Sequence, residues 1–171
     1  PPPPPVLPCD LGQTGSQLGN CQDCPAGKYK HVVGDLACTA CEPHSTTAST
    51  KSTLKTDCQC NAGYSGPNGG PCTACDTGKY RVAGGDTGCS DCPDYSLSPA
   101  ASTAQTDCQC NAGYSGPNGA TCTVCEAGKY KMAVGSAVCS DCPADSLSPA
   151  ASTAVTSCQC NKGYTGTNGG T

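Results

Sequence analysis

The stretch 58–69 reads CQCNAGYSGPNG, and the same twelve letters return at 108–119. A third copy, CQCNKGYTGTNG, occupies 158–169, so the stretch recurs every 50 residues. The similarity extends beyond it, because residues 58–107 match residues 108–157 at 35 of 50 positions. Self-similarity at one fixed period marks a repeat architecture in which each copy is one structural unit.

Cysteine is the residue type that must hold these units together. The 171 residues include 19 Cys, one Met and no Trp or Phe, and Val and Leu together number 15. So few large apolar side chains cannot bury enough surface to offset the entropy of ordering the backbone, and small secreted domains use disulfides instead. The sequence therefore predicts a small disulfide-rich fold. We expect a linear tandem array of ~50-residue modules with short β-hairpins and turns, little regular secondary structure and no helical core.

Composition also limits the compartment and the partners. Disulfides persist in oxidising surroundings, so the cysteine content predicts an extracellular or cell-surface protein. The net charge of −4 argues against nucleic acid or an anionic membrane as a partner. No apolar run approaches the ~18–20 residues of a membrane span, so no span is predicted in this segment.

The cysteine spacing sets the repeat boundaries. One unit reads C-x11-C-x2-C-x13-C-x2-C-x15/16-C-x, and Cys9 opens the first unit because it precedes Cys21 as Cys60 precedes Cys72. The predicted divisions are a polyproline II segment at 1–8, repeats at 9–59, 60–109 and 110–159, and the start of a truncated fourth repeat at 160–171. On this prediction the sequence is a window from a longer array, and Cys160 pairs with a missing partner.

Two segments of each unit resemble known extracellular modules. The pattern C-x-C-N-x-G-Y-x-G at 58–66, 108–116 and 158–166 resembles the end of an epidermal-growth-factor-like module. The pattern C-x2-C-x2-G-K-Y-[KR], followed by C-x2-C-P and a Ser/Thr tract, resembles the cysteine-rich repeat of ephrin receptors. It is also similar to the repeat of tumour-necrosis-factor receptors.

Spacing alone does not fix how the cysteines pair, but the resemblance implies nine bridges. Each would close a loop of a dozen to twenty residues and stabilise the fold by about 3 kcal/mol. The implied pairs are Cys9–Cys21, Cys24–Cys41, Cys38–Cys58, Cys60–Cys72, Cys75–Cys92, Cys89–Cys108, Cys110–Cys122, Cys125–Cys142 and Cys139–Cys158.

Metal and redox sites are the competing interpretations of the repeated C-x2-C. Paired C-x2-C motifs occur in structural zinc sites, and a single one occurs in redox sites. Zinc does not explain the C-x-C pairs, and a thioredoxin-like site needs a βαβ context that is absent. His31 and His44 do not recur and are predicted to be surface residues. Because no catalytic arrangement is evident, we predict a non-enzymatic segment with no catalytic residues, no metal and no cofactor.

Small polar tracts before each C-x-C predict exposed loops that carry O-linked sugar, and these covalent glycans are the only attached groups expected. The candidate acceptors are Ser45, Thr46, Thr47, Ser49, Thr50, Ser96, Ser98, Ser102, Thr103, Ser146, Ser148, Ser152 and Thr153. An unmodified polar loop is the alternative. The candidates for hydroxyproline or its glycans are Pro1, Pro2, Pro3, Pro4, Pro5, Pro99 and Pro149.

The monotony of the units favours a structural function over ligand recognition. A filament requires one contact repeated many times, whereas a receptor ectodomain usually has diverged modules. In composition, a proline run beside Ser-Pro tracts resembles the wall and flagellar glycoproteins of algae and plants, including mastigoneme-type flagellar hairs. We therefore expect a subunit of an extracellular glycosylated fibre that associates with itself or with other fibre proteins. The alternative is a receptor or adhesion ectodomain stalk that binds a protein ligand, as the ephrin-receptor resemblance implies.

Overall fold

The computed structural model describes residues 7–15, 20–83 and 87–170. Within these ranges the chain forms short antiparallel β-hairpins, and its only helices are three single turns of 3-10 helix. This confirms the predicted tandem array of small disulfide-rich modules without a helical core. The chain divides into two compact units, Pro1–Cys75 with Ala83–Cys89, and Asp76–Val82 with Ser90–Thr171. The division falls inside the predicted repeat 60–109.

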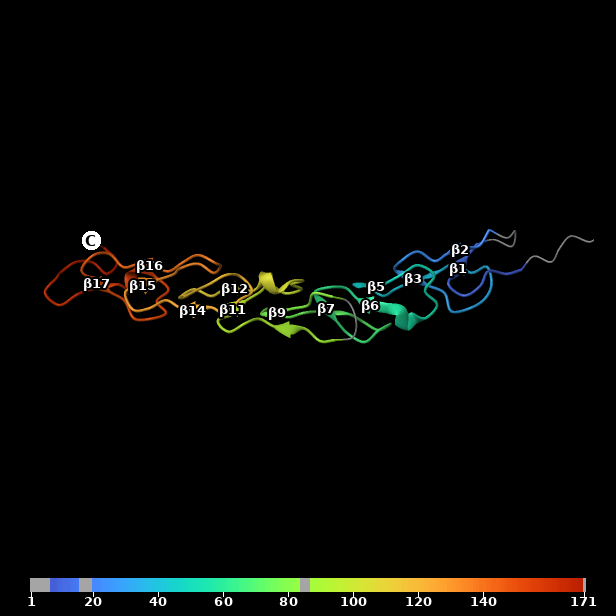
Figure 1. Ribbon diagram of the computed structural model, residues 1–171, viewed down its shortest axis with the longest axis horizontal. Helices are drawn as coiled ribbons and strands as arrows, with labels where there is room; N and C mark the ends of the chain where they lie inside the picture. The colour runs from blue at the N-terminus through green and yellow to red at the C-terminus, as the bar shows by residue number, and fades with distance from the viewer. Residues whose placement is uncertain (1–6, 16–19, 84–86, 171) are drawn as a thin grey trace, which may run out of the picture. The chain divides into compact units, whose positions relative to one another are not determined.

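The first unit contains four two-stranded hairpins, which pair β1 with β2, β3 with β4, β5 with β6, and β7 with β8 (Figure 1). The 3-10 helix η1 (Lys55–Asp57) directly precedes β6. The strands are β1 (Gln13–Thr14), β2 (Gln22–Asp23), β3 (Lys28–Tyr29), β4 (Thr39–Ala40), β5 (Ser45–Thr47), β6 (Cys58–Cys60), β7 (Tyr64–Ser65) and β8 (Thr73–Ala74).

The second unit contains five hairpins built in the same way, and its two 3-10 helices again precede the second strand of a hairpin. The strands are β9 (Lys79–Tyr80), β10 (Ser90–Asp91), β11 (Ser96–Leu97), β12 (Gln109–Cys110), β13 (Tyr114–Ser115), β14 (Thr123–Val124), β15 (Lys129–Tyr130), β16 (Ser140–Asp141), β17 (Ser146–Leu147) and β18 (Gln159–Cys160). The 3-10 helices are η2 (Gln105–Asp107) and η3 (Val155–Ser157).

A glycine turn starts the middle hairpin of each repeat. In the first repeat the Lys28 N–H donates to the Pro25 carbonyl at 3.1 Å, and Gly27 between them has φ +84°. A positive φ at the third position defines a type II turn and favours glycine. The same geometry recurs at Gly78 and Gly128, with φ +79° and +82°. The G-K-Y motif is therefore the turn and first strand of this hairpin.

Nine disulfides cross-link the described residues, with Cα–Cα distances of 5.5 to 5.8 Å. Each bridge closes one hairpin. Three of them are the bridges that the family resemblance implied for the first hairpin of each repeat: Cys9–Cys21, Cys60–Cys72 and Cys110–Cys122. Cys160 has no disulfide partner among the described residues.

The other six implied pairings were wrong. They were Cys24–Cys41, Cys38–Cys58, Cys75–Cys92, Cys89–Cys108, Cys125–Cys142 and Cys139–Cys158. The structure instead has Cys24–Cys38, Cys41–Cys58, Cys75–Cys89, Cys92–Cys108, Cys125–Cys139 and Cys142–Cys158. The six cysteines of a repeat thus pair in sequential order, first with second, third with fourth and fifth with sixth.

Loop length favours the sequential order. Each C-x2-C flanks a two-residue strand, as Cys38 and Cys41 flank β4. Side chains three residues apart on an extended strand point to opposite faces, so the two cysteines bond to different partners, Cys38 to Cys24 and Cys41 to Cys58. The loops span 14 and 16–17 residues. The interleaved order would have required 17 and 19–20, and shorter loops cost less entropy to close.

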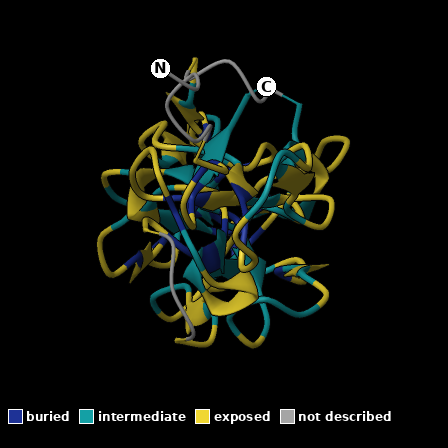
Figure 2. Cartoon of the chain, turned by 90° about the vertical axis from the view of Figure 1, so that its right-hand side faces the viewer, coloured by how far each residue is buried: buried dark blue, intermediate teal, exposed yellow. Residues whose placement is uncertain are grey.

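Cystine and small hydroxyl side chains form the interior. Cys24, Cys108 and Cys158 are fully buried, and Ser98 and Ser148 are only 1% exposed. Apart from Tyr29, which is 8% exposed, few of the larger apolar side chains are buried, and the exposed positions are mainly at the ends of the loops (Figure 2). The cross-links therefore replace an apolar core.

Candidate functional site: the repeated hairpin surface

A buried lysine fastens the middle hairpin of the third repeat to the hairpin before it. The Lys131 side chain is 4% exposed. Its ammonium donates to the carbonyl oxygens of Gly135 and Tyr114 at 2.6 and 2.7 Å. The carbonyls of Cys110 and Asn111 follow at 3.3 and 3.4 Å. Burial lowers the pKa of Lys131 below its usual value, while the carbonyl cage compensates the cation with hydrogen bonds.

The first repeat has the same arrangement around Lys30, which is 2% exposed. Its ammonium donates to the carbonyls of Gln13, at 2.6 Å, and Gly34. The Gly34 N–H in turn donates to the Cys9 carbonyl at 2.8 Å, as the Gly135 N–H donates to that of Cys110. The second repeat has Arg81 at the equivalent place, 4% exposed. A buried cation at this position is therefore a feature of every repeat.

Sequence reasoning quoted G-K-Y-[KR] but missed the role of its last residue. The available signal was that a basic residue follows the tyrosine in all three units. The first basic residue of the motif is different, because Lys79 and Lys129 form cross-strand ion pairs with the exposed Asp91 and Asp141. Exposed pairs of this kind contribute little to stability.

The tyrosine of each G-K-Y motif pairs with a serine that follows the first strand of the last hairpin. Tyr29, Tyr80 and Tyr130 form isolated parallel bridges with Ser52, Ser102 and Ser152 respectively. The N–H of the following residue donates to the same serine carbonyl, at 3.0 Å for Lys131 and Ser152. In the third repeat, the buried cation therefore links the middle hairpin to the hairpin before it, and the tyrosine–serine bridge links it to the segment that follows.

Stacked aromatic rings lie where one repeat meets the next. Tyr64 stacks on His44 with ring centroids 4.1 Å apart, and Tyr114 stacks on Tyr95 at 4.3 Å. His44 and Tyr95 directly precede the last hairpin of the preceding repeat, so these pairs lie at the joints between repeats. Tyr164 is 55% exposed, and Asp145 occupies the position equivalent to His44.

The Ser/Thr tracts are only partly exposed, which narrows the glycosylation prediction. Five candidate acceptors are buried, at 1–8% exposure: Thr47, Ser98, Ser102, Ser148 and Ser152. Their hydroxyls donate to backbone carbonyls, as Ser98 does to Lys79 and Ser148 to Lys129, both at 3.0 Å. A sugar on one of these oxygens would break its hydrogen bond, so these five are the least accessible of the predicted acceptors.

The remaining candidates are accessible to different degrees. Exposed side chains are Thr46, Ser49, Thr50, Thr103 and Thr153. Ser45, Ser96 and Ser146 are half-buried and donate to the carbonyls of Glu42, Pro93 and Pro143. Pro99 and Pro149 are exposed, whereas the predictions for Pro1 to Pro5 lie outside the described residues.

Metal and redox chemistry finds no support in the described ranges. Both cysteines of each C-x2-C are in disulfides with different partners, so no such motif offers a pair of thiolates. No group of three or more His, Cys, Asp or Glu side chains in the described part of the chain could hold a metal ion. His31 and His44 are both exposed. Among the same residues, no helix is long and apolar enough to cross a membrane.

Two comparisons relate the chain to known proteins. Residues 12–58 match the family described as tyrosine-protein kinase ephrin type A/B receptor-like. A stretch of 75 residues is 37% identical to cysteine repeat modular protein B of Toxoplasma gondii. That match covers 42% of this chain and 1% of the relative. The chain is thus a cysteine-rich repeat protein similar to receptor ectodomain repeats, a class that indicates a structural or receptor-like protein.

Proposed function

We propose that this chain is a structural subunit of an extracellular, O-glycosylated fibre or filament, such as a flagellar hair or a cell-surface fibril. The observation that carries the proposal is the repetition of one unit down to its internal contacts. Successive units share the hairpin order, the bridges, the buried cation and the tyrosine–serine bridge. A repeated unit presents a repeated surface, which is what self-association into a filament requires.

The cross-links support an extracellular compartment. Nine disulfides in a chain with few apolar side chains would not survive a reducing cytosol. The similarity to receptor ectodomain repeats agrees with this location. For the repeat boundaries we propose 9–59, 60–109 and 110–159, because each of these ranges covers three consecutive hairpins, the last of which ends one residue beyond the boundary.

The fibre proposal predicts ordered filaments in native material. Negative-stain electron microscopy should show a lateral or axial repeat of one or a few modules. A dispersed monomer that binds a foreign protein tightly would contradict the proposal. Microscopy of the same material after reduction is the control, because filaments built from disulfide-stapled modules should disassemble when the modules unfold.

The O-linked sugar of the proposed fibre should be attached to the exposed hydroxyls of the Ser/Thr tracts. We expect O-linked sugar on the exposed hydroxyls Thr103 and Thr153, and none on the buried Ser98 and Ser148. Site-resolved mass spectrometry of native peptides, with fragmentation that keeps the sugar attached, measures the occupancy of each residue. Because the four residues lie in two closely matching tracts, sugar on Ser98 or Ser148 would contradict the prediction. Sugar on hydroxylated Pro99 or Pro149 would extend it.

A receptor or adhesion ectodomain is the second candidate function. The match of residues 12–58 to the ephrin-receptor-like family favours it directly. In that case the array would act as a stalk or as a protein-binding surface, and the chain would stay monomeric while a heterologous ligand binds. Sedimentation velocity of the purified chain separates this outcome from self-association.

A further inference from the structure

Two tyrosine rings are stacked face to face at the joint between the second and third repeats. The ring centroids of Tyr95 and Tyr114 are 4.3 Å apart, and the ring planes differ by 8°. Tyr95 directly precedes β11 of the second repeat, and Tyr114 is the first residue of β13 in the third. At this separation the two rings are in van der Waals contact. Because Tyr95 is also 55% exposed, the pair is open to solvent.

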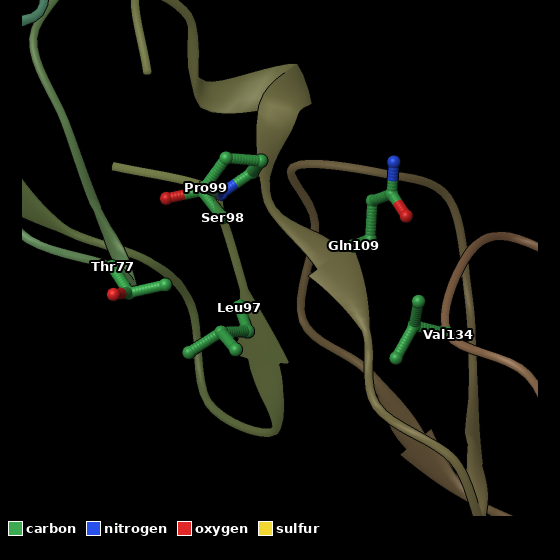
Figure 3. A pocket seen from close by; sticks show the side chains of 6 residues that line it. All are labelled: Thr77, Leu97, Ser98, Pro99, Gln109 and Val134. Atoms are coloured by element: carbon green, nitrogen blue, oxygen red, sulfur yellow. The ribbon is translucent and has the colours of Figure 1, made fainter. Parts of the chain in front are cut away.

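The joint itself has no disulfide across it in the described part of the chain. Cys92–Cys108 is the last bridge of the second repeat and Cys110–Cys122 is the first of the third, so Gln109 alone separates them. A hollow of about 280 Å³ lies beside the joint, and Leu97 of the second repeat and Val134 of the third both line it (Figure 3). The joint is therefore neither cross-linked by cystine nor tightly packed on this side.

The turn that holds Tyr95 does not require a tyrosine. The Ser96 N–H donates to the Pro93 carbonyl at 3.2 Å, and Tyr95 between them has φ +61°. A positive φ favours glycine and is uncommon for bulky side chains. The equivalent residues in the first and third repeats are His44, with φ +62°, and Asp145, with φ +57°. Since three different side chains occupy the same turn, the phenol at position 95 supplies something that the turn does not need.

We propose that Tyr95 and Tyr114 are a site of oxidative coupling, at which the two rings are joined as dityrosine. The oxidant is a peroxidase that consumes hydrogen peroxide, and it removes one electron and one proton from each phenol. The two phenoxyl radicals form a carbon–carbon bond between their ortho carbons. The hydrogen on each joined carbon then moves to the phenolic oxygen of its ring as aromaticity returns. Peroxide takes up the two electrons and two protons and becomes two waters, so the chain loses two hydrogen atoms.

Proximity selects this pair over the other tyrosines. Two rings held in contact couple within one molecule, whereas tyrosines of separate chains must first meet by diffusion. Tyr164 is as exposed as Tyr95, but Asp145 occupies the position of its stacking partner. Tyr64 has a stacked partner at 4.1 Å, but that partner is His44, which has no phenol. Among the stacked pairs of the described residues, the pair at the second joint is the one that contains two phenols.

The bond connects two repeats that the disulfides leave connected by backbone alone. It restricts rotation about the joint at Gln109, because Tyr95 and Tyr114 lie on either side of it. An oxidising extracellular compartment, which the nine disulfides already require, is also the compartment in which such coupling products persist. The inference goes beyond the proposed fibre, because the bond forms within one chain and does not depend on self-association.

The test treats the purified full chain, in a Cys160→Ser background, with a peroxidase and hydrogen peroxide. The substitution removes the odd thiol, which would reduce the tyrosyl radicals. Peptide mass spectrometry after digestion locates each cross-link. We expect the peptides of Tyr95 and Tyr114 to be joined with the loss of two hydrogens, in a yield about tenfold or more above that of any link to Tyr164. Dilution of the chain should leave this yield unchanged.

Two variants test the geometry in opposite directions. Tyr95→His copies the stacked pair of the first joint and should abolish the link to Tyr114. Asp145→Tyr should add a link to Tyr164, because the Asn161 N–H donates to the Asp145 carbonyl at 2.8 Å just as the Asn111 N–H donates to that of Tyr95 at 2.9 Å.

Three results would overturn the inference. The first is coupling that follows exposure, with Tyr164 linked as often as Tyr114. The second is an Asp145→Tyr chain that gains no link, since stacking would then not direct the reaction. The third is native material in which the peptides of Tyr95 and Tyr114 are found only unlinked. Native material that contains the linked peptide, together with selective coupling in the purified chain, supports it.

Discussion

Removal of Cys125 together with Cys139 should cost the third repeat about 3 kcal/mol of unfolding free energy, the stabilisation expected from one bridge over a short loop. Removal of Cys125 together with Cys142 should cost about 6 kcal/mol, because two bridges are lost. The reason is the sequential order, in which Cys125 and Cys139 bond to each other and Cys142 bonds to Cys158. Urea unfolding of both double serine variants, with the remaining disulfides intact, measures the difference.

The two variants share the serine at position 125, so the cost of burying its hydroxyl cancels in the comparison. A Cys160→Ser background removes the odd thiol. Thiol titration under denaturing conditions provides a second readout, with no thiols expected in the first variant and two in the second. Interleaved pairing would reverse both results, and that reversal would refute the order seen in the structure.

Replacement of Lys131 by methionine should destabilise the second unit by about 3 kcal/mol. Methionine is close to lysine in shape but donates no hydrogen bond, so the buried carbonyls around it lose a charged donor. The loop 132–138 should also become more mobile, because the Gly135 carbonyl is one of those acceptors. Urea unfolding gives the free energy, and amide hydrogen exchange at Gly135 reports on the loop.

Two matched variants isolate the effect of the buried cation. Lys131→Arg should lose much less stability, since Arg81 occupies the equivalent position in the second repeat. Lys129→Met alters a lysine two residues away whose ion pair is exposed, and it should change the stability by about 0.5 kcal/mol or less. A Lys131→Met chain as stable as the unchanged one would show that the cage is not a stabilising contact.

The fold class followed from the sequence because cysteine content and spacing are local signals. Nineteen cysteines with few large apolar side chains predicted a disulfide-rich array of short hairpins, which the structure confirms. The bridges inside each repeat were a different matter. The pairing carried over from related families was interleaved, whereas the structure has the sequential order with the shorter loops, as in Cys125–Cys139 and Cys142–Cys158. Either order suits a C-x2-C motif, so the motif alone could not decide between them.

The candidate site was harder to predict because its partners are backbone atoms. Lys131 donates to the backbone carbonyls of Tyr114 and Gly135. Every residue has a backbone carbonyl, so the sequence does not indicate which ones accept. The accessibility of the hydroxyls was hard to predict for a related reason. Ser98 and Thr103 belong to one small polar tract, yet Ser98 donates to the Lys79 carbonyl and is buried while Thr103 remains exposed. The composition of the tract does not tell which of its hydroxyls are buried and which are exposed.

The sequential bridges have a mechanical consequence. When the chain is pulled from its ends, the shortest covalent path from Cys60 to Cys110 passes through three cystines, each 5.6 or 5.7 Å between Cα atoms. Only eight Cα–Cα steps of backbone, between Cys72 and Cys75, Cys89 and Cys92, and Cys108 and Cys110, share the load. The taut length of a repeat is therefore about 45 Å, against about 175 Å for 50 reduced residues. The cystines and the short backbone segments between them carry the tension, and the loops do not. A stretched chain can therefore bear force while its exposed loops keep their shape.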